Sequence, residues 1–306
     1  MMIDLRSDTV TKPTSGMLDY MVKAEVGDDV YKEDPSVNQL EEYMASLFGM
    51  DAALYFPTGT MANQAAIKLL TQPGDQLICD KWAHVYNFEG GGAAFNSGVS
   101  CKLIDGDRGK ITAEQVENAV NPPDFYHSPL SALVCLENTT NKGGGACYAL
   151  DDIKAIKNVC EKNDLKLHLD GARLFNAIVA QKHDPKVYGE LFDTISICLS
   201  KGLGAPMGTI LLGNKEVMDK AMRVRKILGG GMRQVGFAAA AAYYALQHQV
   251  DRLKDDHRRA KEIAETLLGQ DYIADVEPVE TNIVIFYLKK SAVKASDFLA
   301  YLEKNK

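Results

Sequence analysis

Long hydrophobic runs, an excess of positive charge and closely spaced cysteines are all missing from this 306-residue chain. No segment reaches the length of a membrane span, and the first eight residues hold no apolar stretch of the kind that a signal peptide needs. The net charge of −7 offers no general attraction for nucleic acid or anionic lipid. We therefore expect a cytoplasmic protein that binds neither nucleic acid nor membrane.

Two further kinds of site are disfavoured by what the sequence lacks. The six cysteines include no C-x-x-C pair, and several lie in apolar runs where a thiol behaves as a small hydrophobe. We expect reduced cysteines and no metal site. The G-x-G-x-x-G spacing of nicotinamide-dependent dehydrogenases is absent after the first expected strand, since Gly202 and Gly204 come late and directly follow a lysine.

Short apolar runs alternate with helical patterns along the chain, and 46% of the residues are hydrophobic. This alternation predicts an α/β fold in which helices sandwich a mostly parallel sheet of seven strands. The expected strands are the apolar runs at residues 52–56, 76–79, 100–103, 132–136, 166–169, 194–199 and 208–212.

Helical patterns fill the segments between these runs. The clearest span Met61–Leu70, Thr112–Val120 and Leu150–Asn163. A longer pattern, from about Met232 to Leu268, is interrupted by the charge-rich stretch Asp251–Lys261.

A strand at Thr281–Leu288 and a helix from Ser296 to the end then predict a small α+β domain. We divide the chain into an N-terminal arm at residues 1–20, a large domain at 21–245 and a small C-terminal domain at 246–306.

Two of the expected strands each lead to a charged residue. The run Leu167–Leu169 is followed by Asp170, and the run Ile195–Ser200 is followed by Lys201. A carboxylate for the ring nitrogen and a lysine for the aldehyde are the two groups that pyridoxal phosphate needs. The pair therefore predicts a pyridoxal-phosphate enzyme acting on amino acids, with the cofactor in the large domain.

A phosphate favours the N-terminus of a helix, where backbone N–H groups without partners meet it. The segment Pro57–Asn63 follows an apolar run and opens a helix, with Gly59 allowing close approach and the Thr60 hydroxyl adding a donor. A threonine at such a position is also a common helix N-cap, so both interpretations stay open.

His84 is a candidate to stack on the cofactor ring. It follows the strand expected at 76–79, at the edge of the sheet where ligands gather in open α/β folds. Glu89 and the glycines at 90–92 come next and let a ligand approach closely. A purely structural histidine is the alternative.

Ordered motifs over most of the chain resemble those of the pyridoxal-phosphate-dependent L-threonine aldolases, relatives of the aromatic β-eliminating lyases. The motifs are Leu5–Thr11, Gly27–Tyr31 with Asp34 and Pro35, Pro57–Asn63, His84 with Glu89–Gly91, Leu136–Thr139, His168–Arg173, Ser200–Leu203 and Gly229–Gln234. The resemblance implies the fold of type I pyridoxal-phosphate transferases. It also implies an aldehyde-lyase that cleaves L-threonine, L-allo-threonine and other β-hydroxy amino acids to glycine and an aldehyde, in threonine catabolism and glycine biosynthesis.

The resemblance also assigns the contacts with the cofactor. Lys201 would bond to the aldehyde, and Asp170 would keep the pyridine nitrogen protonated. Lys226, or Arg225 in its place, would reach the phosphate across a subunit interface, which implies a homodimer or homotetramer with shared active sites. The cofactor-binding set that the resemblance implies is Gly59, Thr60, His84, Glu89, Asp170, Arg173, Lys201 and Lys226.

The amino-acid substrate would be held by a second set of residues. Ser7 and Arg173 would grip its carboxylate, and Tyr31 would line the site. His127 resembles the family's second active-site histidine, which faces the substrate hydroxyl; an ordinary loop residue is the alternative. The catalytic set is Lys201, Asp170, His84 and His127, with either histidine as the base for the hydroxyl proton.

The sequence departs from the family at two points. Thr140 stands where many members carry histidine, and the chain stops at Lys306, before the segment in which the family has a further carboxylate-binding arginine. The second departure predicts a weaker hold on the substrate carboxylate. A β-eliminating lyase or aminotransferase using the same Lys201 and Asp170, and a cofactor-binding protein with impaired catalysis, are the alternatives.

Overall fold

A seven-stranded sheet forms the centre of the computed structural model, which describes residues 3–305. The strand order is β1-β7-β6-β5-β4-β2-β3, in which β7 runs antiparallel to β1 and β6 while the other neighbours are parallel. The predicted α/β fold is confirmed, with each strand within two residues of its expected bounds. The strands are β1 (Ala52–Phe56), β2 (Gln76–Asp80), β3 (Ser100–Ile104), β4 (Ser131–Glu137), β5 (Lys166–Gly171), β6 (Thr194–Cys198) and β7 (Thr209–Gly213).

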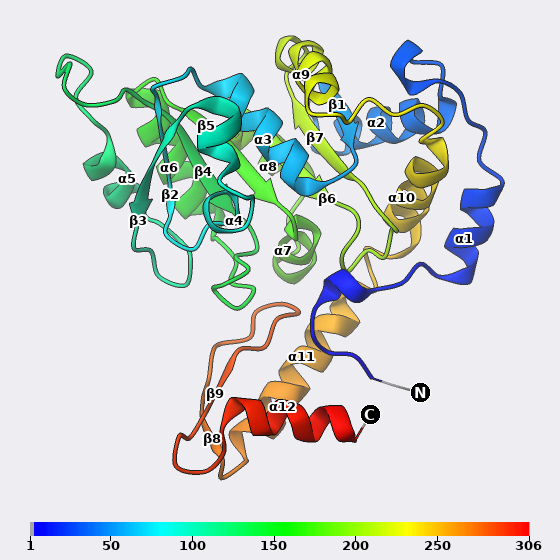
Figure 1. The fold of residues 1–306 in the computed structure, drawn as a ribbon, viewed down its shortest axis with the longest axis vertical. Helices are drawn as coiled ribbons and strands as arrows, with labels where there is room; N and C mark the ends of the chain where they lie inside the picture. Colours follow the sequence, from blue (N-terminus) through cyan, green and yellow to red (C-terminus); the bar gives the residue numbers. More distant parts are fainter. Residues whose placement is uncertain (1–2, 306) are drawn as a thin grey trace.

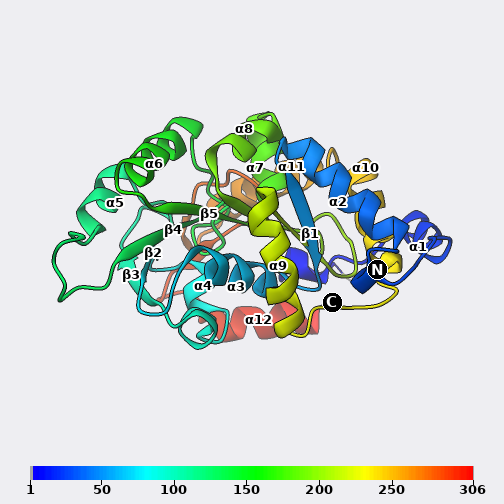
Figure 2. The ribbon, with the colours of Figure 1, turned by 90° about the horizontal axis from the view of Figure 1, so that it is seen from above.

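Helices cover both faces of this sheet (Figure 2). One face carries α3 (Gly59–Leu70), α4 (His84–Asn87) and α9 (Lys215–Ile227). The other carries α5 (Ala113–Ala119), α6 (Leu150–Lys162), α7 (Leu174–Gln181) and α8 (Pro185–Leu191). Because both faces are covered, the central strands are almost continuously apolar and buried rather than alternating.

The N-terminal helices pack beside β1, at one end of the sheet. There α1 (Ser15–Val22) and α2 (Pro35–Phe48) contact α10 (Gly236–His248), whose buried alanines let the helices approach closely (Figure 1). Two short 3-10 helices, η1 (Asp8–Val10) and η2 (Asp29–Tyr31), belong to the N-terminal part of the chain, whereas the short π-helix η3 (Ala93–Ser97) contacts α3 and β3. Within residues 3–305, no helix is both long and apolar enough to span a membrane.

A small α+β unit follows the main sheet. Figure 1 shows it at one side of the sheet, reached through α11. Its elements are α11 (Leu253–Leu268), the antiparallel pair β8 (Ile273–Val276) and β9 (Phe286–Leu288), and α12 (Ala295–Lys304). The strand expected at residues 281–288 is therefore present only over its last three residues.

The expected interruption at Asp251–Lys261 is wrong, because most of this stretch lies inside α11. The break between α10 and α11 falls at residues 249–252 instead. Arg258 pairs with Glu262 one helical turn later, so the charges support the helix rather than end it.

Candidate active site

The ends of β5 and β6 bring the two predicted cofactor residues to one edge of the sheet. These strands are parallel neighbours with Asp170 opposite Ser196, and Lys201 lies in the turn that follows β6. Asp170 is buried, whereas Lys201 is partly exposed. The Lys201 ammonium makes no hydrogen bond or ion pair within the described chain, so its amine is available to react.

Asn63, in the first half of α3, joins Asp170 to a second buried carboxylate. Its Nδ2 donates to Asp170 Oδ2 over 2.9 Å and to Glu89 Oε1 over 2.8 Å. Its Oδ1 accepts from Ser196 Oγ over 2.6 Å. The two carboxylates would repel each other in a buried site, and the amide between them gives each one a donor.

His168 fixes the orientation of that amide. Its Nε2 lies 3.2 Å from Asn63 Oδ1, an acceptor, so Nε2 carries the ring proton. Its Nδ1 then accepts from Thr194 Oγ1, 2.8 Å away. Burial lowers the pKa of His168 to about 4, which keeps the ring neutral near pH 7.

His84 opens α4, just after β2, and is tied to the same network. Its Nδ1 lies 3.0 Å from Glu89 Oε1 and donates to it, while Gln64 Nε2 donates to Glu89 Oε2 over 2.6 Å. The hydrogen bond to Glu89 raises the pKa of His84, and the charge of Asp170 adds to the rise against the effect of burial. The His84 side chain is 31% exposed, so it is the accessible member of this cluster.

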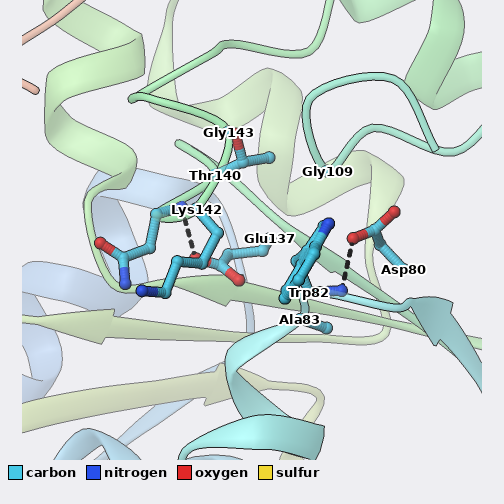
Figure 3. Close-up of a pocket in the computed structure, with 9 residues that line it drawn as sticks. Asp80, Trp82, Ala83, Gly109, Glu137, Thr140, Lys142 and Gly143 are labelled. Atoms are coloured by element: carbon cyan, nitrogen blue, oxygen red, sulfur yellow. Dashed lines mark hydrogen bonds between the residues drawn. The ribbon is translucent and has the colours of Figure 1, made fainter. Parts of the chain in front are cut away.

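Glu137, at the end of β4, holds the backbone around His84. Its Oε2 accepts from the His84 N–H over 3.0 Å, and its Oε1 accepts from the Asn141 N–H over 2.8 Å. Burial and the charge of Asp170 raise the pKa of Glu137 to about 7. Glu137 and Trp82 help to line a cavity of about 10 Å³, which is too small for an amino acid (Figure 3).

Arg173 follows β5 and is engaged by a carboxylate of the protein itself. Its Nε and Nη2 donate to Asp8 Oδ2 and Oδ1 over 2.8 and 2.7 Å, and Asn282 Nδ2 donates to the same Oδ2 over 3.1 Å. Burial would raise the pKa of Asp8, but Arg173 and Asn282 outweigh it and hold that pKa below its ordinary value. The charge of Lys201 also lowers it, so the Lys201 ammonium lies near this pair.

The first turn of α3 forms a polar cradle. Thr58, rather than Thr60, is the N-cap, because its Oγ1 accepts from the Met61 N–H over 3.1 Å. The N–H groups of Gly59 and Thr60 therefore have no acceptor within the helix. The buried hydroxyl of Thr209 has no hydrogen-bond partner in the described residues and would lie 3.6 Å from a Cβ at Gly59. This set of donors suits a phosphate.

Two predicted substrate residues lie on exposed segments near the N-terminus. Ser7 Oγ accepts from the Thr9 N–H over 3.2 Å, so it caps η1 next to Asp8, and it makes no hydrogen bond with Arg173 within residues 3–305. Tyr31, in η2, is 70% exposed. Within one chain, neither is joined to Lys201.

His127 and Lys226 also stand apart from the Asp170 network. His127 is exposed and stacks on Tyr126, with ring centroids 4.1 Å apart, in the loop that precedes β4. Glu137 lies at the far end of that strand, and seven residues of strand span about 20 Å. Lys226 is exposed in the last turn of α9. Its alternative, Arg225, is buried and donates to the Tyr55 carbonyl over 2.6 Å.

Several residues of the site received no role from the sequence, and three of them are instructive. Asn63 closes the expected phosphate segment, Asp8 follows Ser7, and Glu137 ends an apolar run. Each is a polar residue in or beside a motif, and Asn63 and Glu137 are flanked by residues that pack in the core. Their position gave a signal that polar groups are needed there, but their partners come from distant parts of the chain.

Comparison with known proteins agrees with the family resemblance of the sequence motifs. The model of the beta-eliminating lyase family matches residues 4–291. The low specificity L-threonine aldolase of Escherichia coli (strain K12) is 43% identical over 284 residues, covering 92% of this chain and 84% of that protein. Low-specificity L-threonine aldolase 1 of Arabidopsis thaliana is 39% identical over 310 residues, covering 99% and 86%. The solved structure of Leishmania major threonine aldolase has the same fold, with a TM-score of 0.83 at 21% identity over 98% of this chain and 86% of that one.

Proposed function

Because this chain belongs to the beta-eliminating lyase family, we propose that it is a pyridoxal-phosphate-dependent L-threonine aldolase. It would cleave the Cα–Cβ bond of L-threonine, L-allo-threonine and related β-hydroxy amino acids to glycine and an aldehyde. The observation that carries the proposal is the meeting of buried Asp170 and unpaired Lys201 at one sheet edge. Its relatives from Escherichia coli and Arabidopsis thaliana carry that name at about 40% identity.

The residues at this edge fit pyridoxal phosphate. Asp170 offers a buried carboxylate for the ring nitrogen, Lys201 an unpaired amine for the aldehyde, and Gly59 and Thr60 offer backbone donors for the phosphate. Bound there, the cofactor would supply an aldehyde that bonds to amines and a ring that takes up electrons from Cα. The Asp170 carboxylate accepts from Asn63 Nδ2 and from the Ala172 N–H, and these two donors fix its orientation.

The protein's own groups would orient the substrate and move its proton. Arg173, together with Ser7, holds the substrate carboxylate, which fixes the direction of the Cα–Cβ bond. His84 donates through Nδ1 to Glu89, so its Nε2 is the atom that would accept the proton of the β-hydroxyl. His127 is the other candidate for this base.

We further propose that a second copy of the chain completes the site. Tyr31, His127 and Lys226 are exposed in the single chain, and each would serve an active site shared across an interface. The assembly would be a homodimer or a homotetramer. Such an enzyme would serve threonine breakdown and glycine formation in the cytoplasm.

The test begins with the protein loaded with pyridoxal phosphate and reduced with borohydride. We expect mass spectrometry to find the adduct on Lys201, and we expect acetaldehyde and glycine from L-threonine. Lys201→Ala should lose both, while Lys220→Ala, on an exposed face of α9, should keep both. An adduct on another residue would contradict the site. An adduct on Lys201 with pyruvate or a keto acid as product would favour a β-eliminating lyase or an aminotransferase instead.

A further inference from the structure

The ion pair between Arg173 and Asp8 bears on how the substrate is recognised. We infer that Asp8 is a positioning residue: it holds one edge of the Arg173 guanidinium so that the remaining edge is directed at the substrate carboxylate. The inference rests on the proposed function and adds a residue to it. Asp8 itself would touch neither the substrate nor the cofactor.

The hydrogen bonds of Arg173 leave room for one more carboxylate. A guanidinium has five N–H donors. Nε and one N–H of Nη2 bind Asp8, and one N–H of Nη1 makes a longer bond of 3.3 Å to Asn141 Oδ1. One donor on Nη1 and one on Nη2 remain. Two donors on adjacent nitrogens are what a carboxylate needs for two parallel hydrogen bonds.

Asp8 is itself held from a distant part of the sequence. Asn282, between β8 and β9, donates to Asp8 Oδ2 over 3.1 Å. The two residues before it are fastened to the main body, since Thr281 Oγ1 donates to the Gly145 carbonyl over 2.8 Å and Glu280 accepts from Arg108 over 2.6 Å. The small C-terminal unit therefore fixes the carboxylate that orients Arg173.

The direction of the Arg173 N–H groups matters more for binding the substrate carboxylate than the net charge of the Arg173–Asp8 pair. Arg173 and Asp8 are only 7% and 9% exposed at their side chains, and together they carry no net charge. A neutral pair attracts an incoming carboxylate through the N–H groups that point at it more than through a long-range field. An arginine without Asp8 would keep its charge but would have no fixed edge to present, so its hold on the substrate would weaken.

Asp8→Asn provides the direct test, because asparagine keeps the shape and turns one acceptor into a donor that meets the Arg173 fork. We expect the KM for L-threonine and the dissociation constant for glycine to rise about tenfold, the loss of one charged hydrogen bond, with kcat changed by less than about threefold. Binding of ethanolamine, which lacks a carboxylate, should stay unchanged. In an Arg173→Gln background, Asp8→Asn should add nothing further.

Asp193→Asn is the matched control. Asp193, like Asp8, is an aspartate paired with basic side chains, and it accepts a backbone hydrogen bond from Leu167, but it lies at the amino end of β6, away from the site. Asn282→Ala removes one donor from Asp8 and should raise the KM by a smaller factor. It decides the question if Asp8→Asn does not fold, and an unchanged KM would then overturn the inference.

Three results for Asp8→Asn would overturn it while the wild type still cleaves threonine: an unchanged or lower KM, an equal loss of ethanolamine binding, or a full effect that persists without Arg173. A wild-type protein that neither cleaves threonine nor binds glycine would count against the proposed function, and the inference would fall with it.

Discussion

This protein has two buried arginine–aspartate pairs that consist of the same groups but lie in different parts of the fold. Arg225 Nη2 lies 2.8 Å from Asp29 Oδ2, with side chains 4% and 0% exposed, beside the edge strand β1. Arg173 and Asp8 are joined at 2.7 Å with nearly the same burial, beside Lys201. The first pair is enclosed by the protein, and we call it the closed pair, although Arg225 Nε and both Asp29 carboxylate oxygens make no hydrogen bond within the described residues. The second, the open pair, keeps one donor on each of Nη1 and Nη2 of Arg173, near Lys201.

The closed pair lies against the buried edge strand β1. Tyr55 in β1 points its backbone groups away from the sheet, where the carbonyl accepts from Arg225 and the N–H donates to Glu41 Oε1 over 2.8 Å. A charged side chain on each group leaves little for another strand to pair with. The comparison teaches that an unused donor on a buried arginine suggests ligand binding only when it lies near reactive groups, as those of Arg173 lie near Lys201 and the Nε of Arg225 does not.

The largest expected effect is a loss of stability when the Arg225–Asp29 pair is broken. Arg225→Gln leaves Asp29 buried without its cation, so we expect the free energy of unfolding to fall by about 3–5 kcal/mol. Urea denaturation measures this, with Arg223→Gln on the exposed face of the same helix as the control. The double variant Arg225→Gln with Asp29→Asn should recover part of the loss. An unfolding midpoint like that of the wild type would show that the closed pair is dispensable.

A substitution in the Arg173–Asp8 pair should reduce activity more than stability. Arg173→Gln removes the charged donors for the substrate carboxylate, worth about 3 kcal/mol, so we expect kcat/KM for threonine to fall about 100-fold, mainly through KM. Its stability loss should be smaller than that of Arg225→Gln, because Asn282 still donates to Asp8. Steady-state kinetics and urea denaturation on both variants test the contrast. Equal stability losses in Arg173→Gln and Arg225→Gln, with an unchanged KM in Arg173→Gln, would contradict the proposed difference between the two pairs.

The hydrogen-bond network that joins Asn63 to Asp170 and Glu89 gives the next prediction. Asn63→Ala removes the one amide that serves both Asp170 and Glu89, at a cost of about 2 kcal/mol. We expect cofactor affinity to fall about 30-fold, because Asp170 loses the donor that fixes its orientation toward the ring nitrogen. Gln64→Ala, which touches Glu89 but not Asp170, should leave cofactor affinity close to that of the wild type. Equal losses in both variants would mean that Asn63 acts through Glu89 alone.

Residues close in the sequence were predicted well, for a physical reason. The seven strands, and the placement of Asp170 and Lys201 at one edge of the sheet, follow from apolar runs and from parallel strands ending at that edge. Both signals are local, and the topology of an α/β sheet converts them into proximity. Among the helices, only the charge-rich start of α11 misled, because i,i+4 ion pairs make a charged segment a good helix.

Partnerships between distant residues could not be predicted in the same way. Asp8 meets Arg173 and Asn282 only after the chain has closed into two units, and no spacing encodes that contact. The sequence likewise offers Arg225 and Lys226 as equals. Burial alone separates them, because one neighbour faces the core and the next faces solvent one hundred degrees around the helix.

The smallest expected effect concerns pH, and it belongs to the open side of the molecule alone. The hydrogen bond that His84 donates to Glu89 raises the pKa of His84, and a protonated ring cannot accept the hydroxyl proton. If His84 is the base, kcat/KM should fall as the pH drops through that raised pKa. Glu89→Gln removes the charge and lowers the pKa of His84, so the acid limb of the pH profile should move to lower pH.

His127→Asn is the control and should leave the acid limb of the pH profile in place. An acid limb that moves with His127→Asn and not with Glu89→Gln would assign the proton to His127. The urea midpoint of Arg225→Gln, on the closed side, should keep the same offset from wild type across this pH range, because neither Arg225 nor Asp29 contacts His84.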